Sequence, residues 1–417
     1  MSGYRGSDLE AVANSWPGHA DLSELLAAHV RESGLADATV DVVALGKASP
    51  EMAMALERNV AVARCLVIGD ATSGADVIGE HPVPGPGSLA AGRRLTAFLN
   101  DDTASDATVF LVSGGASSLC VLPAPPLDLA DVSATWRAAL RVGLDITTLN
   151  RLRAGTSLIA GGAVLRHVRT PQSASFIMVD NVVSGAAWVA SAMTYDYRPS
   201  REEMGALVAR VTKGDDALGE RLLRAHDYRA NEMPAAIRPG HRNIVVAEPS
   251  LLLERARIEA DRRGYRVVNM GSRVQGDVAR VADEWTHDLR RELARGDRVC
   301  LVGVGEVTVS VREAGTGGRC QEFAWRMARS LSDLDRDCIF VATSSDGRDH
   351  VEGVAGAWVD RGTLSRALDW GYNWTAIVEA NDTNRPLGSL GQLLEGGRTG
   401  WNLCDLYALS AEPPASW

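Results

Sequence analysis

The chain has 417 residues, of which 46% are hydrophobic and 23% are charged, and its net charge is −10. This length accommodates two domains of about 100 to 200 residues each. The arginines are scattered among acidic residues without a basic block, which argues against a nucleic-acid polymer as partner. No apolar stretch approaches the roughly 20 residues that cross a bilayer, and the first ten residues lack a signal-peptide pattern. We therefore expect a cytoplasmic protein without a membrane partner.

The spacing of cysteine and histidine gives no sign of a metal or redox motif. The six cysteines never form a Cys-x-x-Cys pair, and the eight histidines show no His-Glu-x-x-His pattern. We expect the cysteines to be reduced residues of the core.

The first half of the chain alternates strand-like apolar runs with amphipathic segments. A leading helix is expected at residues 21–33, and buried strands are expected at 41–46, 63–69, 108–112 and 175–180. Helical segments separate these strands. This alternation predicts a parallel sheet covered by helices.

The second half of the chain repeats the α/β alternation after a break. Residues 198–239 are charged and have no strand signal, which suggests a cap or linker. The expected elements that follow are strands at 243–247, 266–270, 298–302, 307–311 and 338–343, and helices at 251–263 and 277–295. The sequence therefore predicts two α/β domains, residues 1–240, with later segments as candidates to complete the sheet, and residues 241–417.

Lysine is rare in this chain, since only two of the 43 basic residues are lysines. One of them, Lys47, lies where the apolar run 41–46 meets a helix-like segment at 48–58. Arginine serves at the other 41 basic positions, so a lysine at this junction indicates a need for a compact ammonium group. Chance placement is the alternative.

A turn of small residues follows the expected strand at 108–112. It contains Gly114 and Gly115, with hydroxyl groups on Ser113, Ser117 and Ser118. Backbone N–H groups at a helix start and nearby hydroxyl groups bind anions, so this turn is a candidate cradle for a phosphate or carboxylate. Glycine turns after strands also serve packing alone, which is the structural alternative.

A second glycine-rich loop, residues 315–318, precedes a helix expected at 323–331 and places Arg319 at its entrance. A cation at this position could neutralise phosphate charge, and phosphoryl transfer depends on such cations. A surface pair with Glu322 is the alternative.

A kinase also needs carboxylates that hold magnesium and a group that orients or deprotonates the attacking hydroxyl. Asp180 ends an apolar run, so we expect it at the carboxyl edge of the sheet, where open α/β sheets bind ligands. The other candidates are Glu306, Asp346, Asp349 and Asp382. The two aspartates of the turn at 346–349 are alternatively turn formers.

In chain order, a series of short motifs resembles the glycerate 2-kinase family, whose two-domain members carry a C-terminal MOFRL domain. The motifs are Gly46-Lys47-Ala48, His81-Pro82-Val83-Pro84 with Ser88-Leu89-Ala90-Ala91-Gly92-Arg93-Arg94, Ser113-Gly114-Gly115, Asn150 with Arg153, Gly305-Glu306-Val307-Thr308-Val309, Gly317-Gly318-Arg319 with Gln321-Glu322, Asp346-Gly347, and Asn381-Asp382. Their shared order is more specific than any one of them.

The resemblance implies an N-terminal Rossmann-like parallel sheet with flanking helices, a C-terminal MOFRL-like α/β domain, and an active site in the cleft between them. It also implies an ATP- and magnesium-dependent kinase that phosphorylates a hydroxyl of a small hydroxy acid, with a homodimer as a candidate assembly. By motif position, Lys47 and Arg319 are the implied catalytic cations, and Asp180 is the acidic group nearest the reacting hydroxyl.

Further residues take implied binding roles from the same motifs. Those for the nucleotide, phosphate or substrate are Ser113, Gly114, Gly115, Ser117, Ser118, Asn150, Arg153, Gln321, Arg398 and Trp401. The candidate metal ligands are Asp180, Glu306 and Asp346.

The chain departs from the family pattern at four places. The family's Ser-Asp-Val-Pro-Gly-Asp-Asp keeps only its first aspartate, as Asp180, which weakens the case for a metal there. The other departures are Ala160-Gly161-Gly162 for Lys-Gly-Gly, Ser191-Ala192-Met193-Thr194 for Ser-Gly-Pro-Thr, and Gly396-Gly397-Arg398-Thr399-Gly400-Trp401-Asn402 for Thr-Gly-Pro-Thr-Gly-Thr-Asn.

These departures suggest a changed acceptor. Trp401 and Arg398 replace small residues and would offer an aromatic face and a planar cation to a pocket. We expect a kinase for a hydroxy acid larger than glycerate, such as a sugar acid or a nucleoside-derived intermediate of specialised metabolism. The alternatives are an authentic D-glycerate 2-kinase, a catalytically disabled ligand-binding homologue, and an NAD-dependent hydroxy-acid oxidoreductase. Against the last stands the lack of a Gly-x-Gly-x-x-Gly motif after an early strand.

Overall fold

The computed structural model describes residues 7–15, 19–180, 185–233 and 238–413, and the chain divides into two compact units. We call residues 19–247 the N-terminal unit, and residues 1–18 with 248–417 the C-terminal unit. Within the described ranges, no helix is both long and apolar enough to cross a membrane.

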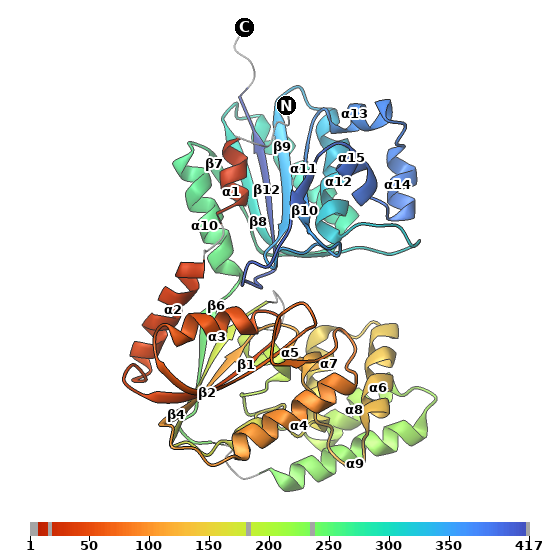
Figure 1. Ribbon diagram of the computed structural model, residues 1–417. Helices are drawn as coiled ribbons and strands as arrows, with labels where there is room; N and C mark the ends of the chain where they lie inside the picture. The colour runs from red at the N-terminus through yellow and green to blue at the C-terminus, as the bar shows by residue number, and fades with distance from the viewer. Residues whose placement is uncertain (1–6, 16–18, 181–184, 234–237, 414–417) are drawn as a thin grey trace. The chain divides into compact units, whose positions relative to one another are not determined.

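The N-terminal unit is built on a six-stranded sheet that is parallel throughout (Figure 1). The central strands are almost wholly buried, which explains why they appear in the sequence as uninterrupted apolar runs. The predicted parallel sheet is confirmed. Its strands are β1 (Thr39–Leu45), β2 (Ala61–Gly69), β3 (Val77–Ile78), β4 (Ala107–Val112), β5 (Gln172–Met178) and β6 (Arg242–Ala247).

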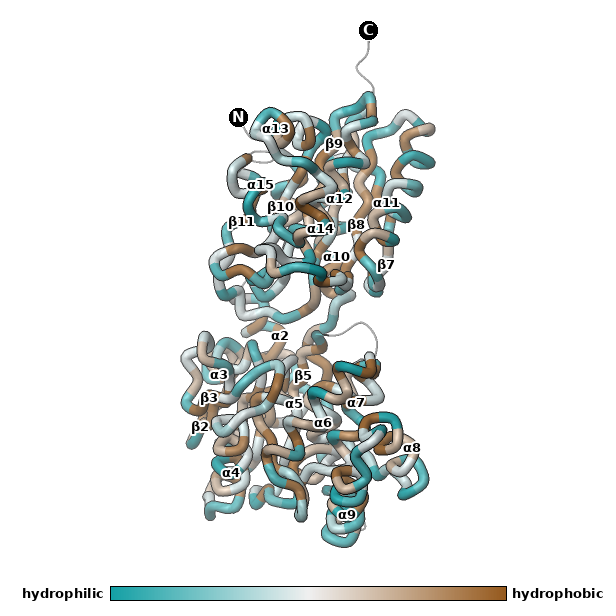
Figure 2. The backbone as a smooth tube through the Cα atoms, turned by 90° about the vertical axis from the view of Figure 1, so that its right-hand side faces the viewer, coloured by the Kyte–Doolittle hydropathy of each residue, from teal (hydrophilic) through white to brown (hydrophobic). Residues whose placement is uncertain are grey.

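Helices pack against this sheet and also form a separate helical cluster. The cluster joins α6 to α9 around its own apolar core, so the segment expected to be a cap or linker is helical and packs within the N-terminal unit. Figure 2 shows α9 as a mostly hydrophilic tube with interspersed hydrophobic positions. The helices are α2 (His19–Glu32), α3 (Ser49–Glu57), α4 (Pro86–Asn100), α5 (Ala116–Leu119), α6 (Leu129–Arg141), α7 (Ile146–Thr156), α8 (Arg201–Val211) and α9 (Asp216–Glu232), with 3-10 turns η1 (Ala163–His167) and η2 (Ala186–Ser191).

In the strand order β3-β2-β1-β4-β5-β6, the chain adds β2 and β3 on one side of β1 and then adds β4, β5 and β6 on the other side. The order of strand addition therefore reverses between β1 and β4. Ligands of open α/β sheets bind outside the carboxyl ends of the strands at such a reversal. β1 ends just before Gly46 and Lys47, and β4 ends just before Ser113. The fold therefore places Lys47 and the small-residue turn at the reversal point.

Gly46 is required for the close approach of these two loops. Its φ is +115°, and a Cβ atom there would lie 2.3 Å from the Oγ of Ser113 and 2.5 Å from its carbonyl oxygen. A side chain at this position would push the two loops apart.

The C-terminal unit contains a mixed six-stranded sheet in the order β11-β10-β9-β12-β8-β7. β7 and β8 are parallel, whereas β12 is antiparallel to both β8 and β9. The strands are β7 (Arg266–Asp277), β8 (Val299–Thr308), β9 (Cys338–Ser344), β10 (Val354–Asp360), β11 (Leu393–Glu395) and β12 (Asp405–Ala411). The helices are α1 (Asp8–Ala13), α10 (Pro249–Arg262), α11 (Val278–Leu293), α12 (Arg319–Ser332), α13 (Thr363–Asp369), α14 (Trp374–Ala380) and α15 (Asn384–Ser389).

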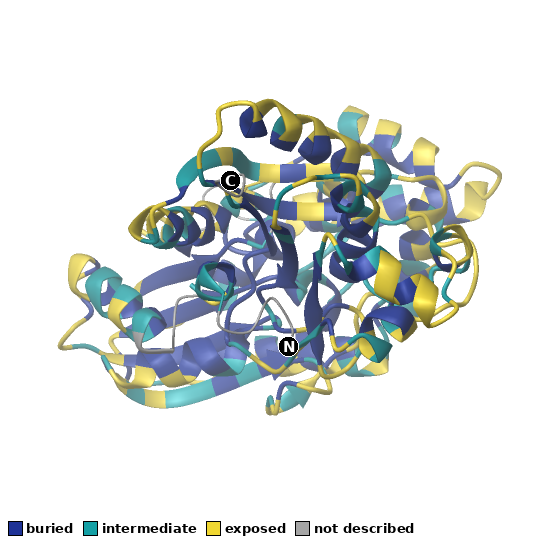
Figure 3. Ribbon diagram, turned by 90° about the horizontal axis from the view of Figure 1, so that it is seen from above, coloured by how far each residue is buried: buried dark blue, intermediate teal, exposed yellow. Residues whose placement is uncertain are grey.

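An aromatic cluster forms the centre of this unit's core. The ring of Trp285 on α11 meets Phe323, Phe340 and Tyr407 edge to face, with ring centroids 5.7 to 6.2 Å apart. Figure 3 shows the strands as mostly buried and the helices as buried on one side and exposed on the other. Such edge-to-face packing adds to the burial of apolar surface in holding α11 and α12 on the sheet.

Two strands differ from the sequence prediction. Residues 243–247, expected to begin the second series, form β6 at the edge of the first sheet. Residues 299–308 form one strand, β8, which joins the strands expected at 298–302 and 307–311, and residues 309–311 lie outside it. A Cβ atom on Gly305 would lie 1.9 Å from the carbonyl oxygen of Val274, so this glycine admits the backbone of β7.

Asp349 caps the start of α12. Its carboxylate accepts hydrogen bonds from the backbone N–H groups of Cys320 (3.1 Å) and Gln321 (2.9 Å). A Cβ atom on Gly318 would lie 2.2 Å from this carboxylate, so the glycine before Arg319 makes room for the cap. Burial, and then the charge of Asp405, raise the pKa of Asp349 to about 6.

The Gly46 contact predicts a large stability loss for Gly46→Ala. We expect the free energy of unfolding to fall by about 2 to 5 kcal/mol, from left-handed backbone strain plus overpacking against Ser113. Gly34→Ala is the matched control, because Gly34 also has a positive φ (+68°) but nothing lies within 4 Å of its Cβ position. It should cost about 1 to 2 kcal/mol. Urea unfolding measures both, and equal losses would contradict the role of the contact.

The Asp349 cap predicts a specific pH dependence of stability. Its pKa is raised from 3.8 to about 6, so on acidification the folded protein binds this proton before the unfolded chain does. Through this group, the free energy of unfolding therefore rises as the pH falls from 7 towards 4. Asp349→Asn cannot titrate, so relative to the variant the wild type should gain about 2 kcal/mol between pH 7 and pH 4. Urea unfolding at both pH values tests this, and a constant difference would refute it.

Candidate active site

Hydrogen bonds tie the loop after β1 to the turn after β4. The backbone N–H of Lys47 donates to the carbonyl oxygen of Gly114 at 2.9 Å. The hydroxyl of Ser113 accepts from the N–H of Ala48 at 3.1 Å and donates to the carbonyl oxygen of Leu45 at 3.2 Å. Ser113 is fully buried, so its hydroxyl joins the two loops instead of facing a ligand.

The turn residue Gly115 lies against Lys47 and His81. A Cβ atom there would lie 3.3 Å from Cγ of Lys47 and 3.5 Å from Cδ2 of His81. Gly115 has a φ of +85° and precedes α5, which is only four residues long. Ser118, on α5, donates to the carbonyl oxygen of Gly115 and is buried. The turn thus keeps its shape through its own hydroxyl groups.

His81 was not among the predicted site residues, although its His-Pro-Val-Pro motif is visible in the sequence. Partial loss of hydration, and then the positive charges of Lys47 and Arg153, lower the pKa of His81 to about 4. Its ring is therefore neutral at pH 7 and can exchange hydrogen bonds beside Lys47. Only the folded chain brings this histidine to the turn.

A chain of hydrogen bonds leads from the turn to Arg153. The hydroxyl of Ser117 lies 2.8 Å from that of Ser191, which donates to Oδ1 of Asn150 at 3.0 Å. Nη1 of Arg153 donates to the same oxygen at 3.0 Å. The guanidinium carbon of Arg153 lies 3.3 Å from the ring centroid of Trp136. The structure therefore brings together Ser117, Asn150 and Arg153, which the sequence places in one binding set.

Ser191 reaches this network from a strained turn. Ala190, Ser191 and Ala192 have φ values of +54°, +55° and +57°, which cost side-chain-bearing residues about 1 to 2 kcal/mol each. The N–H groups of Gly161 and Gly162 donate to the carbonyl oxygens of Ser191 and Ala192, at 3.1 and 2.9 Å. Strain of this kind concentrates at functional sites, where surrounding contacts hold it.

Asp180 lies two residues beyond β5, at the same sheet edge as Lys47, and is partly buried. The position expected from the sequence is thus the one observed. The residues that depart from the family pattern after it, Asn181, Val182, Val183 and Ser184, lie outside the described residues.

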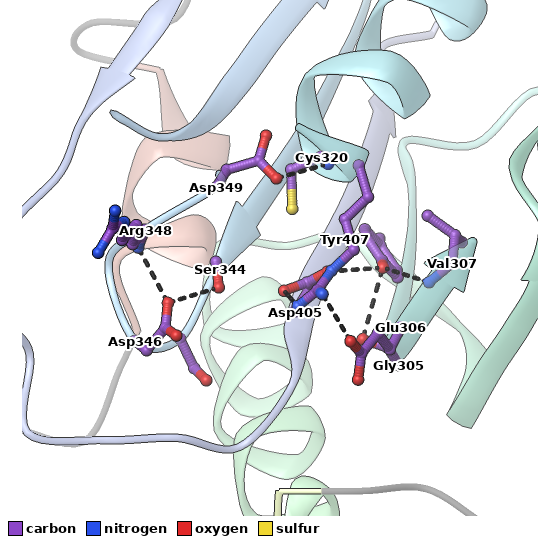
Figure 4. A network of polar contacts seen from close by, with 12 residues as sticks. Gly305, Glu306, Val307, Cys320, Ser344, Asp346, Arg348, Asp349, Asp405 and Tyr407 are labelled. Carbon is purple, nitrogen blue, oxygen red and sulfur yellow. Dashed lines mark hydrogen bonds and ion pairs between the residues drawn. The ribbon is translucent and has the colours of Figure 1, made fainter. Parts of the chain in front are cut away.

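In the C-terminal unit, Arg319 is held by two carboxylates, Asp405 and Glu306. Figure 4 shows these two acidic side chains and Tyr407 beside Asp405. Its Nε and Nη2 atoms donate to the two oxygens of Asp405, at 2.6 and 3.0 Å, and Nη1 donates to Glu306 at 2.5 Å. Asp405 is fully buried, whereas the side chain of Arg319 remains 34% exposed. The hydroxyl of Tyr407 donates to Asp405 at 3.1 Å. Arg319 is therefore a positioned cation that a ligand can still reach.

The candidate metal ligands have other partners in the structure. Glu306 accepts from Arg319, and Asp346 accepts from the hydroxyl of Ser344 and the N–H of Arg348, both at 2.9 Å. Among the described residues, no three His, Cys, Asp or Glu side chains lie close enough together to hold a metal ion. Within the described residues of the C-terminal unit, Glu306 and Asp346 thus form no preformed magnesium site, and no step proposed below runs through Mg²⁺.

Gln321 and Trp401 differ from expectation, whereas the binding role of Arg398 stays a prediction. Gln321 is fully buried, donates to Asp349 and accepts from Asn384, so it supports the cap of α12. Trp401 is only 2% exposed, so its ring lies in the interior of the unit and not on a surface open to a ligand. Arg398 is exposed.

Two family models match the chain. Residues 10–222 match a family described as a domain of unknown function, DUF4147, and residues 299–405 match the MOFRL family. A crystal structure titled glycerate kinase, from Thermotoga maritima, has the same fold, with a TM-score of 0.81 and 22% identity. That match covers 97% of this chain and 98% of the other.

Curated relatives match over most of their length. The chain is 28% identical over 382 residues to a "Glycerate kinase" of Macaca fascicularis, covering 80% of this chain and 96% of the relative. It is 27% identical over 381 residues to a "Glycerate 2-kinase" of Pyrococcus horikoshii, covering 87% and 85%. A relative from Agrobacterium vitis, 30% identical over 336 residues and covering 79% and 76%, is named "Putative hydroxypyruvate reductase". With its DUF4147 and MOFRL regions and this fold, the chain belongs to the glycerate kinase family, as a distant member.

Proposed function

We propose that this protein is an ATP-dependent kinase that phosphorylates a hydroxyl group of a small hydroxy acid. The observation that carries the proposal is Lys47, whose loop is fixed by the turn after β4 at the reversal of the sheet. Ligands bind at such a reversal, and an ammonium group there suits a phosphoryl group in transfer.

The transfer is a substitution at phosphorus. The hydroxyl oxygen of the acceptor forms a bond to the γ-phosphorus of ATP, the bond from that phosphorus to the bridging oxygen breaks, and ADP leaves with its electron pair. Lys47 stabilises the charge on the transferred group. Asp180 orients the attacking hydroxyl and accepts its proton. Arg319, held by Asp405 and Glu306, binds phosphate oxygens of the nucleotide without having to be ordered first.

The identity of the acceptor goes beyond the family assignment. Relatives are named glycerate kinases, so D-glycerate is the first acceptor to test. An acceptor larger than glycerate, including sugar acids and nucleoside-derived acids, belongs in the same panel because the binding set around Arg153 differs from the family pattern at Ala160 and Met193.

An oxidoreductase is the competing activity, since one relative is named a hydroxypyruvate reductase. The turn after β1 reads Gly46-Lys47-Ala48-Ser49-Pro50, without the Gly-x-Gly-x-x-Gly that approaches a dinucleotide. Incubation with NADH or NADPH and hydroxypyruvate, followed by absorbance, distinguishes the two activities. Oxidation of the reduced cofactor at rates above those of ADP formation would replace the kinase proposal.

Replacing Lys47 by alanine tests its role against an internal control. The only other lysine, Lys213, is exposed. We expect Lys47→Ala to lower kcat for ADP formation at least about 100-fold, because the charge on the transferred group loses its cation. Lys213→Ala should retain wild-type kcat, and both variants should unfold at the wild-type urea concentration. ADP release in a coupled assay measures this; full activity of Lys47→Ala would refute the assignment.

Replacing Arg319 by lysine tests the fixed guanidinium. Lysine keeps the charge but cannot bond both oxygens of Asp405 and Glu306 at once. We expect kcat/KM for ATP to fall about 10-fold or more. Arg326→Lys is the control, because Arg326 lies on the same helix and pairs with the buried Glu322 at 2.7 Å. If both variants lose activity equally, Arg319 supports the helix and not the nucleotide.

A further inference from the structure

A largely apolar cavity of about 50 Å³ lies within the N-terminal unit. Apolar lining residues come from α6, α7 and the loops beside them, among them Leu122, Leu127, Val132, Leu149 and Ile159. Apolar cavities in proteins stay dry and accept apolar groups. The cavity is thus suited to a hydrocarbon group of small size.

Polar groups of the candidate site line the same cavity. Ser117, Ser191 and Arg153, all members of the hydrogen-bond chain described above, are among its lining residues. Ser117 lies two residues after Gly115, which packs against Lys47 and His81. Ser117 therefore connects the cavity lining to the turn that packs against Lys47.

Two residues from different parts of the chain contribute to the apolar wall of the cavity. Ala160 lines it with a single methyl group. Met193 lines it as well. A lysine at position 160 would bring an ammonium group to this wall and disfavour an apolar ligand.

Arg153 offers a partner for an anion beside this cavity. Its guanidinium is fixed by Trp136 and Asn150, and its buried Nε–H has no hydrogen-bond partner in the described part of the chain. A planar guanidinium held in one orientation pairs well with a carboxylate. A carboxylate would also offset the burial of this charge, which otherwise lowers the pKa of Arg153.

We propose that the acceptor is a 2-hydroxy acid with a short apolar side chain. Arg153 binds its carboxylate, and the cavity lined by Leu127 and Ala160 takes the side chain. The proposal rests on the kinase activity proposed above and names its substrate class. A cavity of about 50 Å³ is about one third of the size that admits benzene, so a methyl or ethyl group fits, whereas an isobutyl or a benzyl group does not. The hydroxyl groups of a sugar acid would lose their hydrogen bonds in this cavity.

The test is a series of acceptors that differ only in the side chain. D-glycerate, D-lactate, D-2-hydroxybutyrate, D-2-hydroxyisocaproate and D-phenyllactate, with the L-enantiomers in parallel, are compared by kcat/KM with ATP and magnesium. Each buried CH₂ group should raise kcat/KM about fourfold, so D-2-hydroxybutyrate should exceed D-lactate about fourfold and should also exceed D-glycerate. The isocaproate and phenyllactate derivatives should fall below D-2-hydroxybutyrate.

Cavity variants make the test specific. Leu127 and Leu207 are each 8% exposed and belong to the same core cluster, but only Leu127 lines the cavity. Leu127→Ala should extend the preference to phenyllactate, whereas Leu207→Ala, with a similar loss of stability, should leave the order of acceptors unchanged. Ala160→Leu should fill the cavity and remove the preference for apolar side chains.

The outcomes separate this inference from the kinase proposal. If glycerate is phosphorylated best and Leu127→Ala and Leu207→Ala behave alike, the kinase proposal stands and the apolar acceptor is refuted. If no acid in the series is phosphorylated, but the apolar acids raise the melting temperature of the wild type and not of Ala160→Leu, the apolar site stands and the kinase proposal falls. If neither turnover nor a shift in melting temperature occurs, both are refuted.

Discussion

The contact between the loops after β1 and β4 is the constraint on which the candidate site depends. Gly46 carries no side chain, so Ser113 can bond to both ends of the loop that bears Lys47. Because the strand order reverses at this point, the connections that follow β1 and β4 run to opposite sides of the sheet, an arrangement at which open α/β sheets bind ligands. The same contact fixes the turn that contains Gly115, and Gly115 packs against His81. The hydrogen-bond chain to Arg153 begins two residues later in this turn, at Ser117. One close approach of backbone thus positions an ammonium group, a neutral imidazole and a guanidinium.

The C-terminal unit reaches a comparable result by a different route, with charge in place of backbone contact. Asp405 is fully buried, and its two oxygens hold Arg319 in a bidentate pair. A buried carboxylate without a partner is costly, so Arg319 is bound to this position by the fold. Asp349 supports the same helix start, and the proximity of Asp405 helps to raise its pKa to about 6. The position of the Arg319 guanidinium therefore depends on Asp405, which pairs with it, and on Asp349, which caps the start of its helix. Neither acid has to contact a ligand.

The fold class, and the places of several candidate site residues in the fold, could be predicted from the sequence because they depend on local patterns. The buried strands β1, β4 and β5 are continuous apolar runs, and Lys47 and Asp180 follow the ends of such runs. What sequence could not supply was the partner of each group. Asp405 lies 86 positions from Arg319, and no local pattern links them. Ser113 and Gln321 are the residue types that bind anions, and only their hydrogen bonds within the fold show that they hold loops and helix starts together.

The sheet that an edge strand joins and the burial of single side chains also could not be predicted from the sequence. A strand such as β6 can join either sheet by its composition, and the pairing with β5 decides which. Trp401 replaces a small residue, and from the sequence it could line a pocket or fill the core; burial to 2% exposure decides for the core. Gly303 and Gly305 lie within the single strand β8, and the backbone of β7 lies directly against Gly305. The sequence alone does not show this contact.

Two of the positions that depart from the family pattern lie together in space, although they are far apart in the sequence. Ala160 and Met193 belong to different motifs, yet both line the apolar cavity, and the N–H groups of Gly161 and Gly162 bond to the turn at residues 191–193 that contains Met193. The other departures lie elsewhere, since residues 181–184 directly follow Asp180, and Arg398 and Trp401 belong to the C-terminal unit. A change in the cavity wall alters what an acceptor's side chain meets without altering what a transferred phosphoryl group meets, so the proposed acceptor can differ while the proposed transfer step stays the same.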